Sequence, residues 1–185
     1  MVRIVDIVDH QVIAAVEREE YLNDAINSRC NVIFLLYGSI FNVKELVDRI
    51  KAAGKYVFLH IDFIEGIAQD RSGVAYLAQY IKPTGIISTK NNLIRMAKDM
   101  QLMTIQRLFL IDRNAIMRGI NSIESSKPDA IEVMPGIMPR IIKEMTDMTE
   151  LPIIAGGLVS VQDEIDEALK AGALAVSLGT SGLWL

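Results

Sequence analysis

Short apolar runs alternate with amphipathic segments along nearly the whole chain. The runs expected to form strands are residues 12–16, 31–37, 56–62, 85–88, 103–110, 130–134, 152–155 and 173–177. Most of them are continuous rather than alternating, which is typical of strands buried on both faces of a parallel sheet. Between them, apolar residues recur at helical spacing. Helices are expected from residue 43 up to Gly54, and over residues 73–81, 91–100, 114–125, 139–149 and 161–171.

Eight such units in order favour a closed (β/α)8 barrel of the TIM type. The alternative is an open doubly wound sheet, but no GxGxxG follows the first strand to support it. The chain has 185 residues, and a barrel of this kind usually takes about 200 to 250. The α/β fold must therefore be compact with short loops, and a missing or degenerate helix would fit that length. We expect a single domain over residues 1–185, with residues 1–11 as an N-terminal addition.

Composition and charge narrow the class of protein. Hydrophobic residues make up 51% of the chain and charged residues 23%, which is globular composition. The 19 basic and 23 acidic residues give a net charge of −4, so any contact with nucleic acid needs a local basic patch. The one cysteine, Cys30, cannot form an internal disulfide and is expected to fill buried space. Without a signal-peptide pattern or an apolar run of about 18 residues, we expect a cytoplasmic protein with no membrane contact.

Two short strands near the C-terminus end at small residues. LPIIAGGL (151–158) ends at Gly156 and Gly157, and GALAVSLGTSGLW (172–184) contains Ser177, Gly179 and Thr180. In a barrel, the loops after the last two strands frequently form a phosphate site, because their backbone N–H groups can surround an anion. We therefore expect the barrel to hold a small phosphorylated ligand at these loops.

Polar residues at other strand ends could line the same site. In the strand 56–62, His60 and Asp62 are two residues apart and so would share one face. Arg107 and Glu132 stand inside apolar strands, where a charge is costly unless it is paired, so a salt bridge between them is expected. Arg107 also suits a bidentate grip on a phosphate or carboxylate. Each pair has a purely structural interpretation, as packing of the barrel interior, beside the ligand-binding one.

Other chemistry finds little support in the sequence. A Schiff-base aldolase would need a buried lysine at a strand end, and Lys90 is the lysine at such a position. Residues 88–92 resemble the start of a helix, however, so Lys90 is expected to be solvated, which argues against an aldolase. His60 with Asp62 gives no three-ligand cluster, so neither a metal site nor a cofactor is expected. The long connection Phe63–Ser72 is either a lid ordered by ligand or an ordinary solvated loop.

Six segments together carry a resemblance to a known family. They are HIDFIEGIAQD (60–70), GIISTK (85–90), IQRLFLID (105–112), IEVMPGIMP (131–139), LPIIAGGL (151–158) and ALKAGALAVSLGTSGLW (168–184). In this combination the chain resembles the glycerol uptake operon antiterminator regulatory proteins. The resemblance implies a barrel-shaped regulator that responds to glycerol 3-phosphate and acts on the leader of messenger RNA. It places the phosphate on Gly156, Gly157, Gly179 and Thr180, with His60, Asp62, Arg107 and Glu132 at the polar end.

Two hypotheses of different classes follow. The first is a non-catalytic sensor in which the ligand shifts a loop or a dimer state and thereby RNA binding; a homo-oligomer is left open. Its RNA surface would use Lys90, Arg95 and Lys98 along one helix, or Lys44, Arg49, Lys51 and Lys55 around another, although solvated helix faces give the same pattern. The second is a barrel enzyme, an isomerase, lyase or phosphodiesterase, acting on a small phosphorylated substrate with Glu132 or Asp62 as general base and His60 as acid.

Overall fold

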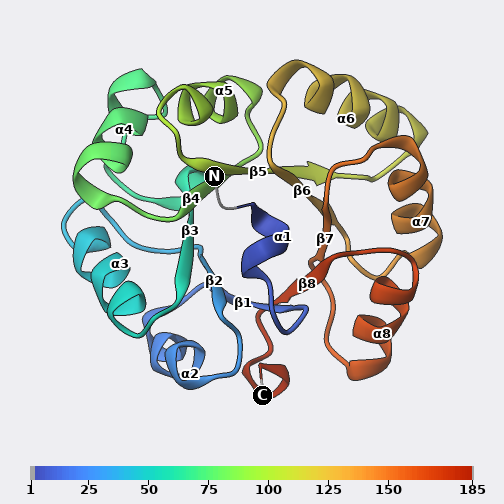
Figure 1. Ribbon diagram of the computed structural model, residues 1–185, viewed down its shortest axis with the longest axis horizontal. Coiled ribbons are helices and arrows are strands. Elements are labelled where there is room, and N and C mark those ends of the chain that lie inside the picture. The colour runs from blue at the N-terminus through green and yellow to red at the C-terminus, as the bar shows by residue number, and fades with distance from the viewer. Residues whose placement is uncertain (1–2, 185) are drawn as a thin grey trace.

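The protein is a closed barrel of eight parallel strands in the order β1 to β8, as the sequence predicts (Figure 1). The computed structural model describes residues 3–184; residues 1, 2 and 185, the ends of the expected 1–185 domain, lie outside this range. The strands are β1 (Val12–Val16), β2 (Val32–Leu35), β3 (Tyr56–His60), β4 (Gly85–Ser88), β5 (Met103–Phe109), β6 (Ala130–Met134), β7 (Ile153–Gly156) and β8 (Ala175–Leu178). The helices around them are α2 (Leu22–Asn27), α3 (Val43–Ala52), α4 (Arg71–Tyr76), α5 (Asn91–Asp99), α6 (Arg113–Ser126), α7 (Pro139–Met148) and α8 (Gln162–Lys170).

The alternation of side chains along each strand builds two separate apolar layers. Inward residues fill the barrel itself, among them Phe34, Phe58 and Ile105. Outward residues pack under the surrounding helices, as Leu35 and Leu59 do. Because both faces of every strand are covered, the strands read as continuous apolar runs in the sequence. Cys30 is buried in the outer layer, as expected.

A short helix, α1 (Ile4–Ile7), closes the N-terminal end of the barrel. It lies in the centre of the ring of strands in Figure 1. Ile4 and Ile7 are buried in the interior layer, while Arg3 and Asp6 pair with each other on the outside. The N-terminal addition predicted for residues 1–11 therefore supplies, through α1, part of the interior packing.

Several element boundaries differ from the sequence prediction. The strand expected over 56–62 ends at His60, and Ile61–Phe63 forms a 3-10 turn instead. The helix expected over 73–81 begins at Arg71, since the Asp70 side chain accepts a hydrogen bond from the Gly73 N–H and caps the first turn. It continues as a π-helical turn, Leu77–Ile81. No helix was predicted after the first strand, but the six-residue α2 lies there, the degenerate helix that the short chain suggested.

The long connection after β3 is tied to its neighbour. Backbone hydrogen bonds join Ile40 to Glu65 and Glu65 to Gly38, so this loop and the loop after β2 form one rim segment. No helix within residues 3–184 has the length and apolar character needed to cross a membrane.

Candidate ligand site at the barrel mouth

A chain of buried polar groups crosses the C-terminal end of the barrel. Arg107 Nε donates a hydrogen bond of 2.6 Å to Glu132 Oε2, which confirms the salt bridge expected from the sequence. Ser177 Oγ donates a second bond of 2.6 Å to the other oxygen, Oε1. All three side chains are buried. Glu132 therefore has a hydrogen-bond donor on each carboxylate oxygen, which makes its burial tolerable.

The register of the strands explains how these residues meet. Arg107 and Glu132 are directly paired on β5 and β6, and Gly156 and Ser177 are directly paired on β7 and β8. A Cβ atom at Gly156 would lie 2.5 Å from Ser177 Oγ and 2.6 Å from Glu132 Oε1. Glycine at position 156 thus leaves the room in which the carboxylate reaches across β7 to Ser177.

His60, at the end of β3, is buried at 1% exposure beside this polar chain. Neither ring nitrogen makes a hydrogen bond within residues 3–184. Asp62 Oδ2 approaches His60 Nδ1 to 3.3 Å, but the contact does not meet hydrogen-bond geometry. Burial, with the nearby Arg107 charge as a second cause, lowers the pKa of His60 to about 3. The imidazole is therefore neutral at pH 7 and presents one donor and one acceptor.

Asp62 has a role that differs from the prediction. It was expected to share a strand face with His60, but the strand ends at His60 and Asp62 lies in the turn that follows. Its carboxylate accepts hydrogen bonds from Ser88 Oγ at 3.3 Å and from the Thr89 N–H at 3.0 Å. Asp62 thereby ties the end of β3 to the end of β4 and still lies against His60.

The loops after β7 and β8 offer backbone N–H groups. Within residues 3–184, the N–H groups of Gly157, Gly179 and Thr180 donate to no protein acceptor. Gly157 has φ +76°, a conformation suited to glycine, and a Cβ there would also lie 2.5 Å from Met134 Cε. Pairing of Gly156 with Ser177 brings these two loops side by side. Backbone N–H groups gathered in this way can bind an anion.

Two phenylalanines stand at the edge of this mouth, and neither was predicted from the sequence as part of the site. The Phe63 ring packs on the His60 ring with centroids 4.3 Å apart and remains 49% exposed. Phe109 is 55% exposed and pairs in register with Met134, one inward position beyond Arg107 and Glu132. The available signal was spacing, since Phe109 follows Arg107 by two residues on the same strand.

The three residues predicted for RNA lie along α5. Lys90 precedes the helix at the mouth end and donates a hydrogen bond to Gln69. Arg95 is exposed in the middle of the helix. Lys98, in the last turn, pairs with Asp129 at 2.9 Å. These basic groups therefore follow the length of one helix from the mouth toward the opposite end of the barrel.

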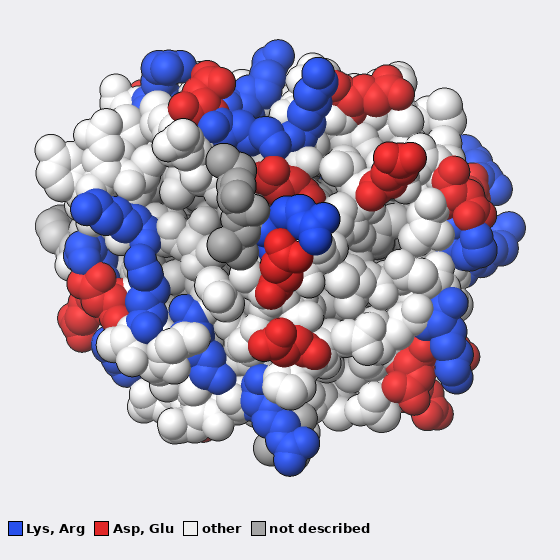
Figure 2. Space-filling model, in the orientation of Figure 1, with Lys and Arg blue, Asp and Glu red and all other residues white. Residues whose placement is uncertain are grey.

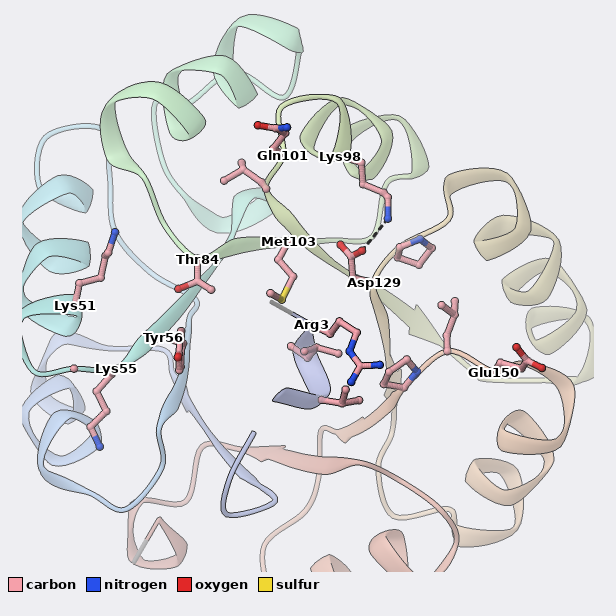
Figure 3. A pocket seen from close by; sticks show the side chains of 17 residues that line it. Arg3, Lys51, Lys55, Tyr56, Thr84, Lys98, Gln101, Met103, Asp129 and Glu150 are labelled. Atoms are coloured by element: carbon pink, nitrogen blue, oxygen red, sulfur yellow. Dashed lines mark hydrogen bonds and ion pairs between the residues drawn. The ribbon is translucent and has the colours of Figure 1, made fainter. Parts of the chain in front are cut away.

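A pocket of about 1040 Å³ lies at that opposite end, around α1. Figure 3 shows Arg3 at its centre and the Lys98–Asp129 ion pair on its wall. Its other lysines are engaged as well: Lys51 donates to the Lys82 carbonyl, and Lys55 to the carbonyls of Ser28 and Cys30. The lysines that line this pocket therefore already have partners within the protein. Nowhere in residues 3–184 do three His, Cys, Asp or Glu side chains gather closely enough to hold a metal ion.

Comparison with known proteins agrees with the barrel fold. Residues 12–184 match the family described as glycerol-3-phosphate responsive antiterminators. An uncharacterised Escherichia coli K12 protein, YgcP, is 37% identical over 173 residues, covering 94% of this chain and 91% of its own length. A glycerol uptake operon antiterminator regulatory protein from Listeria monocytogenes is 34% identical, with a TM-score of 0.92 over 95% of each chain. An antiterminator-related protein from Thermotoga maritima is 30% identical, with a TM-score of 0.83 over 94% of this chain and 96% of its own.

Proposed function

Because this chain belongs to the glycerol-3-phosphate responsive antiterminator family, we propose that it is a non-catalytic sensor of glycerol 3-phosphate that binds the leader of glycerol-uptake messenger RNA. In this proposal the ligand occupies the barrel mouth. RNA binding on the protein surface then changes with the occupancy of that mouth. No cofactor or metal is part of the mechanism.

The mouth has the two halves that this ligand needs. The phosphate would accept hydrogen bonds from the N–H groups of Gly157, Gly179 and Thr180. The glycerol hydroxyls would face His60 and the Arg107–Glu132 pair, which can donate and accept hydrogen bonds. Phe63 and Phe109 would border the short carbon chain at the rim.

The unpartnered His60 is the single observation that carries this proposal. A buried polar group without a hydrogen bond costs about 1 to 3 kcal/mol, so a ligand that supplies the missing partner recovers that free energy on binding. A histidine placed only for packing would be expected to have its nitrogens satisfied within the protein.

The enzyme hypothesis uses Glu132 or Asp62 as general base. Both oxygens of Glu132 accept hydrogen bonds, from Arg107 and Ser177, and both oxygens of Asp62 accept them from Ser88 and Thr89. These contacts hold the two carboxylates in fixed positions as acceptors. The geometry therefore favours recognition of a ligand over general-base chemistry.

Thermal unfolding tests the ligand half of the proposal. Millimolar glycerol 3-phosphate should raise the Tm of the protein by mass action, whereas glycerol alone should not. Inorganic phosphate should give a smaller rise, because it fills only the backbone half of the site. In His60→Gln the affinity for glycerol 3-phosphate should fall by about tenfold or more. An unchanged Tm at millimolar ligand would remove the proposal.

A further inference from the structure

Basic residues are concentrated in one stretch of an otherwise acidic chain. Residues 90–143 contain nine Lys and Arg against five Asp and Glu, a net charge of +4, whereas the remaining ten basic and eighteen acidic residues give −8. This stretch builds α5, β5, α6, β6 and the start of α7, which are neighbours in the barrel (Figure 1). In Figure 2, Lys and Arg side chains gather along the upper edge, over α5 and beside α6. Lys and Arg also lie at other edges of this view, but residues 90–143 are the part of the sequence with a net positive charge.

Within that stretch lies the seam between α5 and α6. Ser122 donates a hydrogen bond to Asn91, and Lys98 pairs with Asp129, so one face of α5 lies against α6 and the residues after it. Arg95 follows Asn91 by one turn on this face of α5. Arg118 precedes Ser122 by one turn on the facing side of α6. Both arginines are exposed, one on each of the two helices that form the seam.

Arg95 and Arg118 differ from most basic residues of the chain in their contacts. Within residues 3–184, neither Arg95 nor Arg118 forms an ion pair or a side-chain hydrogen bond. The basic residues of α3, the other candidate surface, differ in this respect: Lys44 pairs with Asp48, and Lys51 donates to a backbone carbonyl. Free guanidinium groups can bind phosphates without first breaking an ion pair.

Two exposed apolar side chains lie at the end of β5 and on the loop that leads to α6. Ile111, on the loop between β5 and α6, is 80% exposed, and Phe109 stands at the barrel mouth two residues before it. Phe109 and Arg107 share the inward face of β5. One strand thus carries the buried arginine of the candidate ligand site and, two residues further on, an exposed aromatic ring.

We propose that single-stranded RNA binds along the α5–α6 seam, with its phosphates on Arg95 and Arg118 and a base stacked on Phe109. This inference rests on the proposed function and specifies the surface through which it acts. Charge decides the occupant, because an RNA backbone is attracted to a positively charged stretch of an otherwise acidic protein. Bases stack on exposed aromatic side chains, and Phe109 offers such a ring next to the ligand. A second copy of this chain has the same net negative charge, so it would be attracted only where one of its acidic patches met this stretch.

The test begins with RNA enriched from a random-sequence pool on the full-length protein in the presence of glycerol 3-phosphate. The affinity of that RNA is then measured for the wild type, Arg95→Glu, Arg118→Glu and the control Arg29→Glu. Arg29 is exposed on the loop between α2 and β2, across the barrel from the seam, and its replacement makes the same change in charge. The Tm rise with glycerol 3-phosphate is recorded for every variant to show that the fold and the ligand site remain.

The expected result is an affinity for RNA at least about tenfold lower in each seam variant, with Arg29→Glu close to the wild type. The slope of log affinity against log salt should fall by about 0.7 for each RNA phosphate that the variant no longer neutralises. Equal affinities in all four proteins would show that RNA does not bind at the seam, while leaving RNA binding itself in place. Failure to enrich any RNA would overturn both the seam and the RNA half of the proposed function. If a seam variant differs from the wild type in molar mass by light scattering but keeps its affinity for RNA, the seam is an interface between copies of the chain. That result would also overturn the inference.

Discussion

Glu132 on β6 accepts a hydrogen bond of 2.6 Å from Ser177 on β8, across a strand that lies between them. The intervening residue, Gly156, has no side chain to block the contact. The sequence marked Gly156 as a phosphate-loop glycine, but its first structural role is to let two polar side chains meet. The site is therefore sensitive to changes that add a single carbon atom.

Gly156→Ala should weaken glycerol 3-phosphate binding and destabilise the fold by about 1 to 3 kcal/mol, because its methyl group would displace Ser177 and Glu132. Denaturant unfolding and the ligand-induced Tm rise measure both effects. Gly182→Ala is the matched control, since a Cβ there has no heavy atom within 4 Å. Equal behaviour of the two variants would contradict the steric argument.

Arg107 and Glu132 should depend on each other energetically. Glu132→Leu alone leaves the buried guanidinium unpaired and should cost about 3 to 5 kcal/mol, and Arg107→Leu should cost a similar amount. The double variant should be more stable than the sum of the two losses predicts. A double-mutant cycle from urea unfolding gives the coupling, and a coupling near zero would show that the pair is not linked.

Stability should fall in acid through His60. Its pKa is about 3 in the folded protein against a reference value of 6.5, so the unfolded chain binds the extra proton between these two pH values. The stabilisation of the neutral form is complete above pH 6.5 and is lost as the pH falls toward 3, at about 1.4 kcal/mol per pH unit. Urea unfolding at a series of pH values should show this slope in the wild type and a shallower one in His60→Gln. Parallel pH profiles would argue against a neutral, buried imidazole.

Removing the apolar packing of α1 should destabilise the whole barrel. Ile7→Ala takes away a side chain buried in the interior layer and should cost about 2 to 5 kcal/mol. Val5, on the same helix, is 39% exposed, so Val5→Ala should change the free energy of unfolding by much less. If Ile7→Ala and Val5→Ala change the free energy of unfolding by the same amount, α1 is not part of the cooperative core.

The strands were predictable because each apolar run carries its own signal, independent of its neighbours. The Arg107–Glu132 pair was also predictable, since two charges in adjacent apolar strands need a partner. The bond from Ser177 to Glu132 was not, because it depends on the stagger of three strands around the closed barrel. The exposure of Phe109 could not be predicted either. An apolar residue at a strand end is expected to be buried unless the loops around it are known to leave it uncovered.

α2 and α1 show a second limit. α2 has six residues and α1 has four, which is too few for a periodic apolar pattern to be recognised in the sequence. Their positions are set by packing, of Leu22 and Ala25 in the outer layer and of Ile4 and Ile7 in the interior. Tertiary packing rather than local sequence therefore fixes where these two helices form.

Side chains fill the barrel interior and α1 covers its N-terminal end, so a small molecule bound at the mouth would enter and leave on the same side. In the proposed site it would pass the exposed rings of Phe63 and Phe109 both on entry and on release. A base stacked on Phe109 would therefore slow both steps. Where the base also raises the equilibrium affinity for the small molecule, linkage requires the small molecule to raise the affinity for the base by the same factor.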